Sequence, residues 1–139
     1  MVGFPIPQEY PLSELVAQEL TQVCIGINDV RLNFYRRVQD ASGQSQWRAG
    51  ASVDIESGFE LHEAGAPVQT ASNENLGASA GCLTVLLRQC VSSVERLPKN
   101  ELALIFSNGA MLQLFTDPIG FESYHLHIDG DSINVTATK

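Results

Sequence analysis

Two histidines, His125 and His127, stand two residues apart in a stretch that alternates apolar and polar residues, and Asp129 follows at the next polar position. Successive side chains of a strand point to opposite faces, so this spacing puts all three on one face of a predicted strand. Imidazole and carboxylate groups can together bind a divalent metal. No local motif supplies further ligands, and paired polar residues on a solvent-facing strand explain the pattern equally well. We therefore assign no metal or other cofactor, and whether His125 and His127 bind a metal stays open.

A second group of polar side chains surrounds a turn predicted at 57–58. Its members alternate with apolar residues and so line one face of a predicted hairpin; they are Asp54, Glu56, Glu60 and His62. Neighbouring carboxylates push each other's pKa values apart, which suits an acid–base pair. The same groups can dock lysines and arginines of a partner, or simply form the solvent-facing side of an amphipathic hairpin. Of the two functional interpretations we favour docking, and the similar turn near the C-terminus adds Asp129 and Asp131 to the predicted partner-binding face.

The usual catalytic and nucleotide-binding motifs are missing from the sequence. Three cysteines, Cys24, Cys82 and Cys90, lie beside apolar residues without metal-ligand spacing, which predicts packed, inert thiols in a reducing compartment. No G-x-S-x-G elbow, phosphate-binding loop or dinucleotide fingerprint occurs. The chain is therefore not expected to be an enzyme, although a small enzyme or ligand-binding domain stays an alternative.

Acidic side chains outnumber basic ones by sixteen to eight, a formal net charge of −8. The excess is uneven, because residues 1–48 carry a net of −1 and residues 49–139 a net of −7. Such a field repels nucleic acids and anionic membranes and speeds encounter with basic partners. A small basic patch at Arg31, Arg36 and Arg37, interleaved with Phe34 and Tyr35, is the exception, but the overall charge argues against nucleic-acid binding.

Patterns along the 139 residues predict one α+β domain, residues 1–139, built on antiparallel sheet. Apolar spacing predicts two helices, over 11–20 and about 76–89. Alternating residues predict strands elsewhere, and Asn108-Gly109 between two apolar runs predicts a hairpin. A connection rich in small and polar residues, 65–77, is expected to be mobile.

The two halves, 11–64 and 76–136, resemble each other, since each predicts one helix followed by a meander of antiparallel strands. A single half is too small to bury its own apolar face, so an internal duplication would pack both onto one core. Chance is the alternative explanation, because short alternating strands all look alike.

The run from Leu104 to Leu112, with its Asn108-Gly109 turn, and the following strand with Glu122 and Tyr124 resemble the C-terminal end of a bacterial family of small uncharacterised domains. Some members look like immunity proteins encoded beside interbacterial toxins. The resemblance covers about residues 83–135, and 47–61 is a fainter match to the family's earlier hairpin. It implies hairpin structure and brings no catalytic residues.

These observations together predict a non-enzymatic immunity or inhibitor protein that binds a cognate toxin or effector. The excess of acidic residues fits a protein that neutralises a basic partner. The sequence shows no signal peptide or membrane span, so we expect the protein to be cytoplasmic. A homodimeric adaptor that pairs through an open sheet edge is a further alternative.

Overall fold

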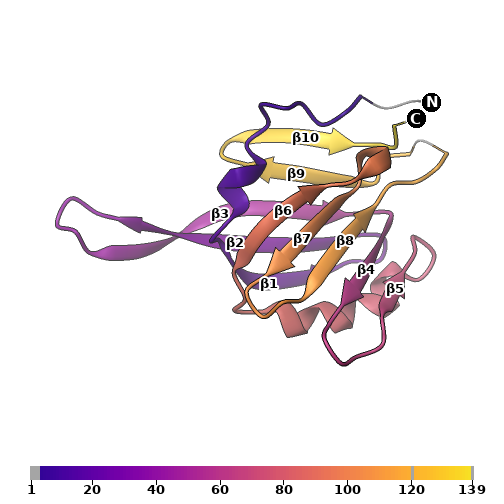
Figure 1. Ribbon diagram of the computed structural model, residues 1–139, viewed down its shortest axis with the longest axis horizontal. Coiled ribbons are helices and arrows are strands. Elements are labelled where there is room, and N and C mark those ends of the chain that lie inside the picture. Colours follow the sequence, from indigo (N-terminus) through magenta and orange to yellow (C-terminus); the bar gives the residue numbers. More distant parts are fainter. Residues whose placement is uncertain (1–3, 120, 139) are drawn as a thin grey trace.

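The computed structural model describes residues 4–119 and 121–138. These residues fold into two five-stranded antiparallel sheets joined by short helical turns and loops (Figure 1). The first sheet has the order β1 (Glu19–Ile25), β2 (Val30–Gln39), β3 (Ser45–Ile55), β9 (Tyr124–Ile128), β10 (Asp131–Val135). The second sheet has the order β5 (Gln69–Ala71), β4 (Gly58–His62), β8 (Met111–Phe115), β7 (Leu102–Phe106), β6 (Val91–Arg96). The expectation of a largely antiparallel fold is confirmed, and the protein is mainly β.

Alternation of apolar and polar residues explains how the sheets pack. In β2 the buried side chains are Val30, Leu32 and Phe34, and their neighbours point outward. The same period-two pattern holds in the facing strands of the second sheet, where Phe59 and Leu61 are buried. Residues from both sheets and from the short helical turns form one continuous hydrophobic cluster. The inner faces of the sheets therefore share a single core, as in a β-sandwich.

The strand order is the same for the two halves of the chain. Strands β1, β2 and β3 form a meander in the first sheet, and the chain then crosses to add β4 and β5 to the second sheet. Strands β6, β7 and β8 form a meander in the second sheet, and the chain then crosses back to add β9 and β10 to the first. Each sheet thus contains three strands of one half and two of the other, an order that an internal duplication would produce. The duplication itself stays a prediction.

The two predicted helices are largely replaced by tight turns. Over 11–20 the structure has only a 3₁₀ turn, η1 (Leu12–Leu15), and residues 19–20 already belong to β1. Over 76–89 a four-residue helix, α1 (Leu76–Ser79), continues as a 3₁₀ segment, η2 (Ala80–Leu86). A third 3₁₀ turn, η3 (Pro98–Asn100), joins β6 to β7. The two helical segments end at Val16 and Leu87, where the backbone becomes extended, and Ala17 and Arg88 with positive φ then turn the chain into the next strand.

One further expectation about the middle of the chain is wrong, and another segment there holds more regular structure than its composition indicates. The turn at 57–58 does not make a hairpin, because β3 and β4 lie in different sheets and residues 56–57 carry the chain across the sandwich. Gly58 begins β4 where a Cβ would lie 2.5 Å from the carbonyl oxygen of Ala71, so only glycine fits the close approach of β5. The connection 65–77, expected to be mobile, contains β5 and the start of α1. The Asn108-Gly109 hairpin is confirmed, with Gly109 at φ 86°.

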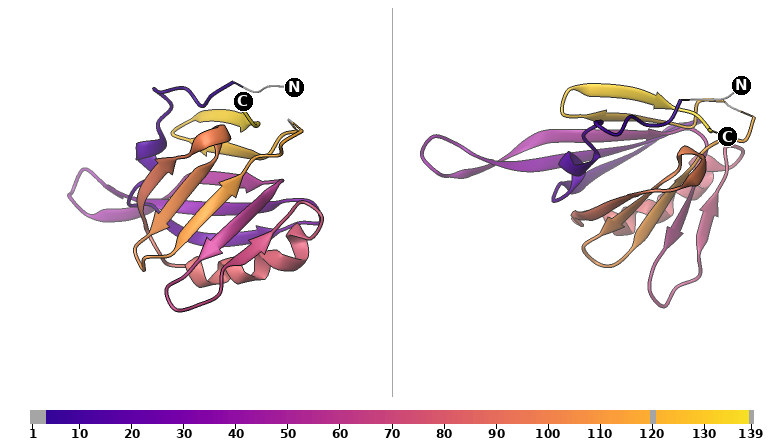
Figure 2. Two further views of the ribbon diagram at one scale, coloured as in Figure 1. Left: turned by 45° about the vertical axis from the view of Figure 1, so that its right-hand side comes forward. Right: turned by 45° about the horizontal axis from the view of Figure 1, so that its top comes forward.

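The β2–β3 hairpin extends well beyond its neighbours (Figure 2). Pairing with β1 ends at Tyr35, and pairing with β9 ends at Ser52. Beyond these points residues 36–48, which we call the ribbon, pair only with each other. Within the described residues, no helix is long and apolar enough to cross a membrane.

Candidate functional site

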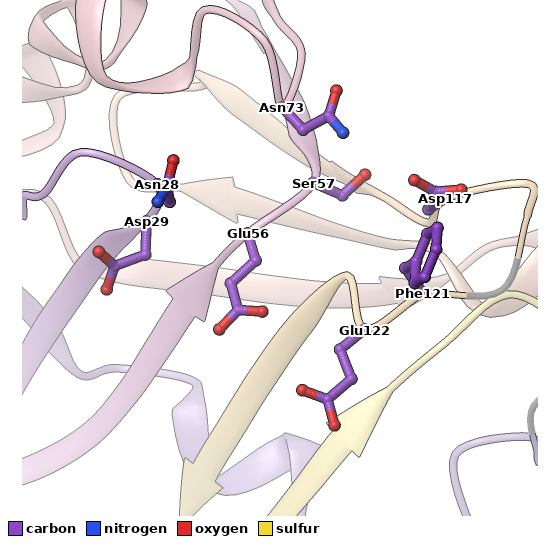
Figure 3. Close-up of a pocket in the computed structure, with 8 residues that line it drawn as sticks. All are labelled: Asn28, Asp29, Glu56, Ser57, Asn73, Asp117, Phe121 and Glu122. Atoms are coloured by element: carbon purple, nitrogen blue, oxygen red, sulfur yellow. The ribbon is translucent and has the colours of Figure 1, made fainter.

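A cavity of about 540 Å³ lies at the end of the sandwich opposite the ribbon (Figure 3). Four segments that are far apart in sequence surround it: the β1–β2 turn, the β3–β4 crossover, the β5–α1 connection and the β8–β9 loop. Its lining residues are Asn28, Asp29, Glu56, Ser57, Asn73, Asp117, Phe121 and Glu122. Half of these side chains are carboxylates, so the cavity suits a cationic group.

A buried serine holds the cavity wall together. Ser123 is fully buried, and its carbonyl oxygen accepts hydrogen bonds from the amides of Glu56 and Ser57, each at 2.9 Å. Its hydroxyl accepts one from the Asp117 amide at 2.7 Å and donates one to the Phe121 carbonyl at 3.1 Å. Ser123 therefore fastens the crossover and the β8–β9 loop to each other, which fixes three carboxylates around one space.

Exposed apolar side chains flank the acidic cavity. Phe121, which lines it, is 67% exposed. Ile27, in the turn that carries Asp29, is 92% exposed, and Ile119, in the loop that carries Asp117, is 71% exposed. Scattered single apolar residues are ordinary on protein surfaces. Three on two of the four segments around one acidic cavity make a surface with both apolar anchors and charge, as protein interfaces have.

Glu56 and Glu122 lie on either side of His125, which is on β9. The Nε2 atom of His125 is 3.2 Å from Oε1 of Glu56 and 3.5 Å from Oε2 of Glu122. This atom is buried, and it has no hydrogen-bond partner of good geometry. One ligand atom of each residue lies within 4.8 Å of the others, which is close enough for all three to contact one divalent cation. Within the described residues the candidate metal ligands are thus Glu56, Glu122 and His125, and His127 and Asp129 are not among them.

The two histidines do share the outer face of β9, as predicted, but they belong to different clusters. His127 contacts Ser132 through Nδ1 at 2.6 Å, and its Nε2 lies 3.8 Å from Asp54. Asp54 is bound in turn by the guanidinium of Arg31, with contacts of 2.7 and 3.1 Å. Hydrogen bonding to Asp54 raises the pKa of Arg31. Asp54 is mostly buried and already paired, so it is poorly placed to meet a partner.

The predicted partner-binding residues lie in separate places. Glu60 and His62 contact each other at 2.8 Å on the outer face of β4, in the second sheet, which points away from the outer face of the first. Asp129 and Asp131 lie at the β9–β10 turn, exposed to solvent. Among the six predicted residues, only Glu56 lines the cavity. Residues that flank the same turn in the sequence therefore lie on different sheets in the structure.

Sequence reasoning missed most of the cavity. Asp29 and Asp117 were not selected because each stands alone in a turn, without a neighbouring acid at strand spacing. Glu122 enters the prediction only through the resemblance, and Phe121 does not enter it. The signal that could have found them is the position of all four just outside strand ends, which becomes informative once the strand order is known.

The cysteines do not join any of these clusters. All three are free and half-buried. Burial raises the pKa of Cys82, which keeps this thiol neutral and therefore a poor nucleophile.

Comparison with known proteins finds no family model, no curated protein and no solved structure that matches this chain. The resemblance over 83–135 therefore stays an expectation.

Proposed function

We propose that this chain is a non-catalytic inhibitor or immunity protein that neutralises a basic partner protein by taking one of its arginine or lysine side chains into the acidic cavity. The observation that carries the proposal is the convergence of Asp29, Glu56, Asp117 and Glu122 on one space of about 540 Å³. Their ion-pair contacts within the described residues are with His125 alone, so the carboxylates are available to a cation from outside.

Arginine is the side chain that fits this chemistry best. Its planar guanidinium binds carboxylates with two parallel hydrogen bonds and stacks on aromatic rings. Phe121 offers such a ring beside Asp117 (Figure 3), and a cation over an aromatic face gains about 0.5–2 kcal/mol. The exposed isoleucines Ile27 and Ile119 then meet apolar residues around the inserted side chain. Binding of this kind needs no catalytic group in the inhibitor.

The net charge of the whole chain supports the same proposal, because it acts over longer distances than the contacts in the cavity. A formal charge of −8 attracts a basic protein before contact and raises the association rate, an effect that salt screens. The proposal sets this encounter in the cytoplasm, where the three free thiols stay reduced.

The test compares two variants that change the net charge equally. The cavity variant is Glu56→Gln/Asp117→Asn/Glu122→Gln, and the control is Glu60→Gln/Glu63→Gln/Asp131→Asn. With Nα-acetyl-arginine amide as the probe, nuclear magnetic resonance shifts should concentrate around the cavity in the wild type and the control, and disappear in the cavity variant. A basic protein captured from the source cell with tagged wild type should be lost in the cavity variant only. Equal losses in both variants would show that diffuse charge, and not the cavity, binds the partner.

A divalent-cation site is a second candidate, favoured by the buried, unpartnered Nε2 of His125 between two carboxylates. Nitrogen and oxygen ligands of this kind suit zinc and neighbouring transition metals. Zinc chloride titrated calorimetrically into chelator-treated protein should bind once per chain, and His125→Ala should abolish the binding while His127→Ala retains it. Equal affinity in the two variants would exclude this site.

A further inference from the structure

The ribbon is a basic, aromatic arm on an acidic protein. It carries Arg36, Arg37 and Arg48 against the single acid Asp40, a net of +2. The other residues of the chain therefore carry fifteen acidic and five basic side chains, a net of −10. Charge is thus divided between the two ends of β2 and β3: the ribbon at one end, and the cavity with Asp29 and Glu56 at the other.

The arginines of the ribbon lack acidic partners in the described structure. Arg36 and Arg48 occupy directly opposite positions in the β2–β3 pairing, where like charges destabilise the strand pair. Ion pairs among the described residues include none of the three ribbon arginines. Asp40 is engaged in its own turn, where hydrogen bonds from Ser42 and from the Gln44 amide lower its pKa. Arg36 shares a small pocket with Glu14 and Asp129 of its own chain but forms no ion pair with either, so an anionic group from a partner would relieve the repulsion between the arginines.

The ribbon also presents aromatic surface that its own sheet does not cover. The guanidinium of Arg37 lies 4.9 Å from the ring centre of Trp47, its cross-strand partner. Trp47 is 44% exposed, and Tyr35, at the base of the ribbon, is 42% exposed. A two-stranded ribbon alone is only marginally stable in water, so packing against a partner would stabilise it. Aromatic and arginine side chains are those that most often dominate binding at protein interfaces.

We propose that the ribbon of one molecule docks in the acidic cavity of a second copy, and that the exchange is reciprocal in a two-fold dimer. Charge complementarity favours this occupant, since the same chain supplies both arginines without ion pairs and cavity carboxylates whose ion-pair contacts are with His125 alone. A nucleic acid would meet the −10 remainder of the molecule, with only three arginines to bind its phosphates.

The length of β3 between the ribbon and the cavity requires that the two come from different molecules. Nine residue steps separate Trp47 from Glu56 along β3, which is about 30 Å at 3.3 Å per residue. A ribbon continuous with a core strand does not fold back over that distance onto its own cavity. Two copies aligned antiparallel place each ribbon at the other's cavity, because the same distance separates the two sites in both molecules. A self-complementary contact of this kind closes as a dimer.

The dimer uses the cavity assigned to partner binding under the proposed function, so a basic partner and a second copy compete for it. In the dimer the ribbon of each copy would cover the exposed carboxylates and isoleucines of the other copy until a basic partner displaces it. The competition does not depend on the partner's identity.

Charge reversal in three variants tests the proposal by analytical ultracentrifugation in low salt. The ribbon variant is Arg36→Glu/Arg48→Glu, the cavity variant is Glu56→Lys/Glu122→Lys, and the control is Arg88→Glu/Lys99→Glu, which reverses two exposed bases elsewhere. Wild type and control should dimerise, with dissociation constants that rise at least tenfold between 25 and 250 mM salt. Each of the other two variants alone should dimerise at least tenfold more weakly. Mixing them should restore a one-to-one heterodimer, because every contact again joins opposite charges.

A wild-type chain that stays monomeric in low salt would overturn the proposal, as would a ribbon variant that dimerises like the control. A mixture without heterodimer would overturn it too. Binding of a single-stranded oligonucleotide that is lost in the ribbon variant, with a monomeric wild type, would replace the second copy by nucleic acid. The ribbon variant keeps its cavity and should still bind Nα-acetyl-arginine amide, so failure of the dimer leaves the proposed function standing.

Discussion

The buried hydroxyl of Ser123 gives the sharpest test of how the cavity is built. Ser123→Ala removes both the acceptor of the Asp117 amide and the donor to the Phe121 carbonyl. The hydrogen bonds from the amides of Glu56 and Ser57 to the Ser123 carbonyl oxygen involve only main-chain atoms, so this substitution leaves them intact. The loss therefore falls on the β8–β9 loop, and the crossover keeps its anchor.

The expected cost follows from the group that is left unpaired. Two part-buried hydrogen bonds are lost, and each contributes about 1 kcal/mol net, so we expect the free energy of unfolding to fall by about 2 kcal/mol. For a domain of this size the melting temperature should fall by roughly 8 °C. Loosening of the loop should also weaken binding of a cationic probe, because Asp117 and Phe121 lose their fixed positions.

Urea denaturation and hydrogen exchange measure the two parts of this prediction. The matched control is Ser92→Ala, which removes an exposed hydroxyl that donates to the Ile105 carbonyl at 3.0 Å and should cost less than about 0.5 kcal/mol. Exchange of the Asp117 amide should accelerate about tenfold or more in Ser123→Ala and stay unchanged in the control. Equal stabilities of the two variants would refute the argument that Ser123 holds the cavity wall.

Three further predictions concern pH, close packing and charge. Burial raises the pKa of Tyr10 to about 12 and raises the pKa of Tyr124 further, so above pH 10 the unfolded chain loses both protons before the folded one does; stability should fall as the pH rises from 10 to 12, and Tyr10→Phe should remove about half of this slope in denaturation experiments, leaving the part due to Tyr124. Gly58→Ala places a methyl group against the Ala71 carbonyl and should destabilise by about 1–3 kcal/mol, measured by calorimetry, with Gly81→Ala, which meets no atom, as its control. Arg31→Ala leaves Asp54 without its bidentate partner and should cost about 1 kcal/mol, while Arg31→Ala/Asp54→Ser should cost less in a double-mutant cycle; a double variant less stable than the single one would contradict the pairing.

Strands were predictable from this sequence because alternation is a local signal. Val30, Leu32 and Phe34 point into the core as their spacing indicates, and Gly109 turns the hairpin as an Asn-Gly pair should. Helices were overpredicted because Leu12 and Leu15 satisfy helical spacing and a buried 3₁₀ turn equally well. Strand β5 was missed because a three-residue edge strand carries almost no pattern.

The candidate site was not predictable, for a different reason. Glu56 and Glu122 are 66 positions apart and meet only because β3 pairs with β9, a choice that no local pattern encodes. Acids that looked close, such as Asp54 and Glu60, separate because the chain changes sheets between them. The error was in topology, and the docking role of these residue types stays a prediction.

The exchange of two strands between the halves makes each half dependent on the other for folding. Residues 1–64 contribute β4 to a sheet whose remaining central strands are synthesised later, and β3 waits for β9, which is almost the last strand to leave the ribosome. Such a nascent chain has an open edge on β3 until synthesis is nearly complete, and non-local pairing of this kind folds slowly, in milliseconds to seconds. A chain divided within 63–68 should yield two fragments that are unfolded apart and assemble when mixed, a reporter for folding that leaves the cavity intact.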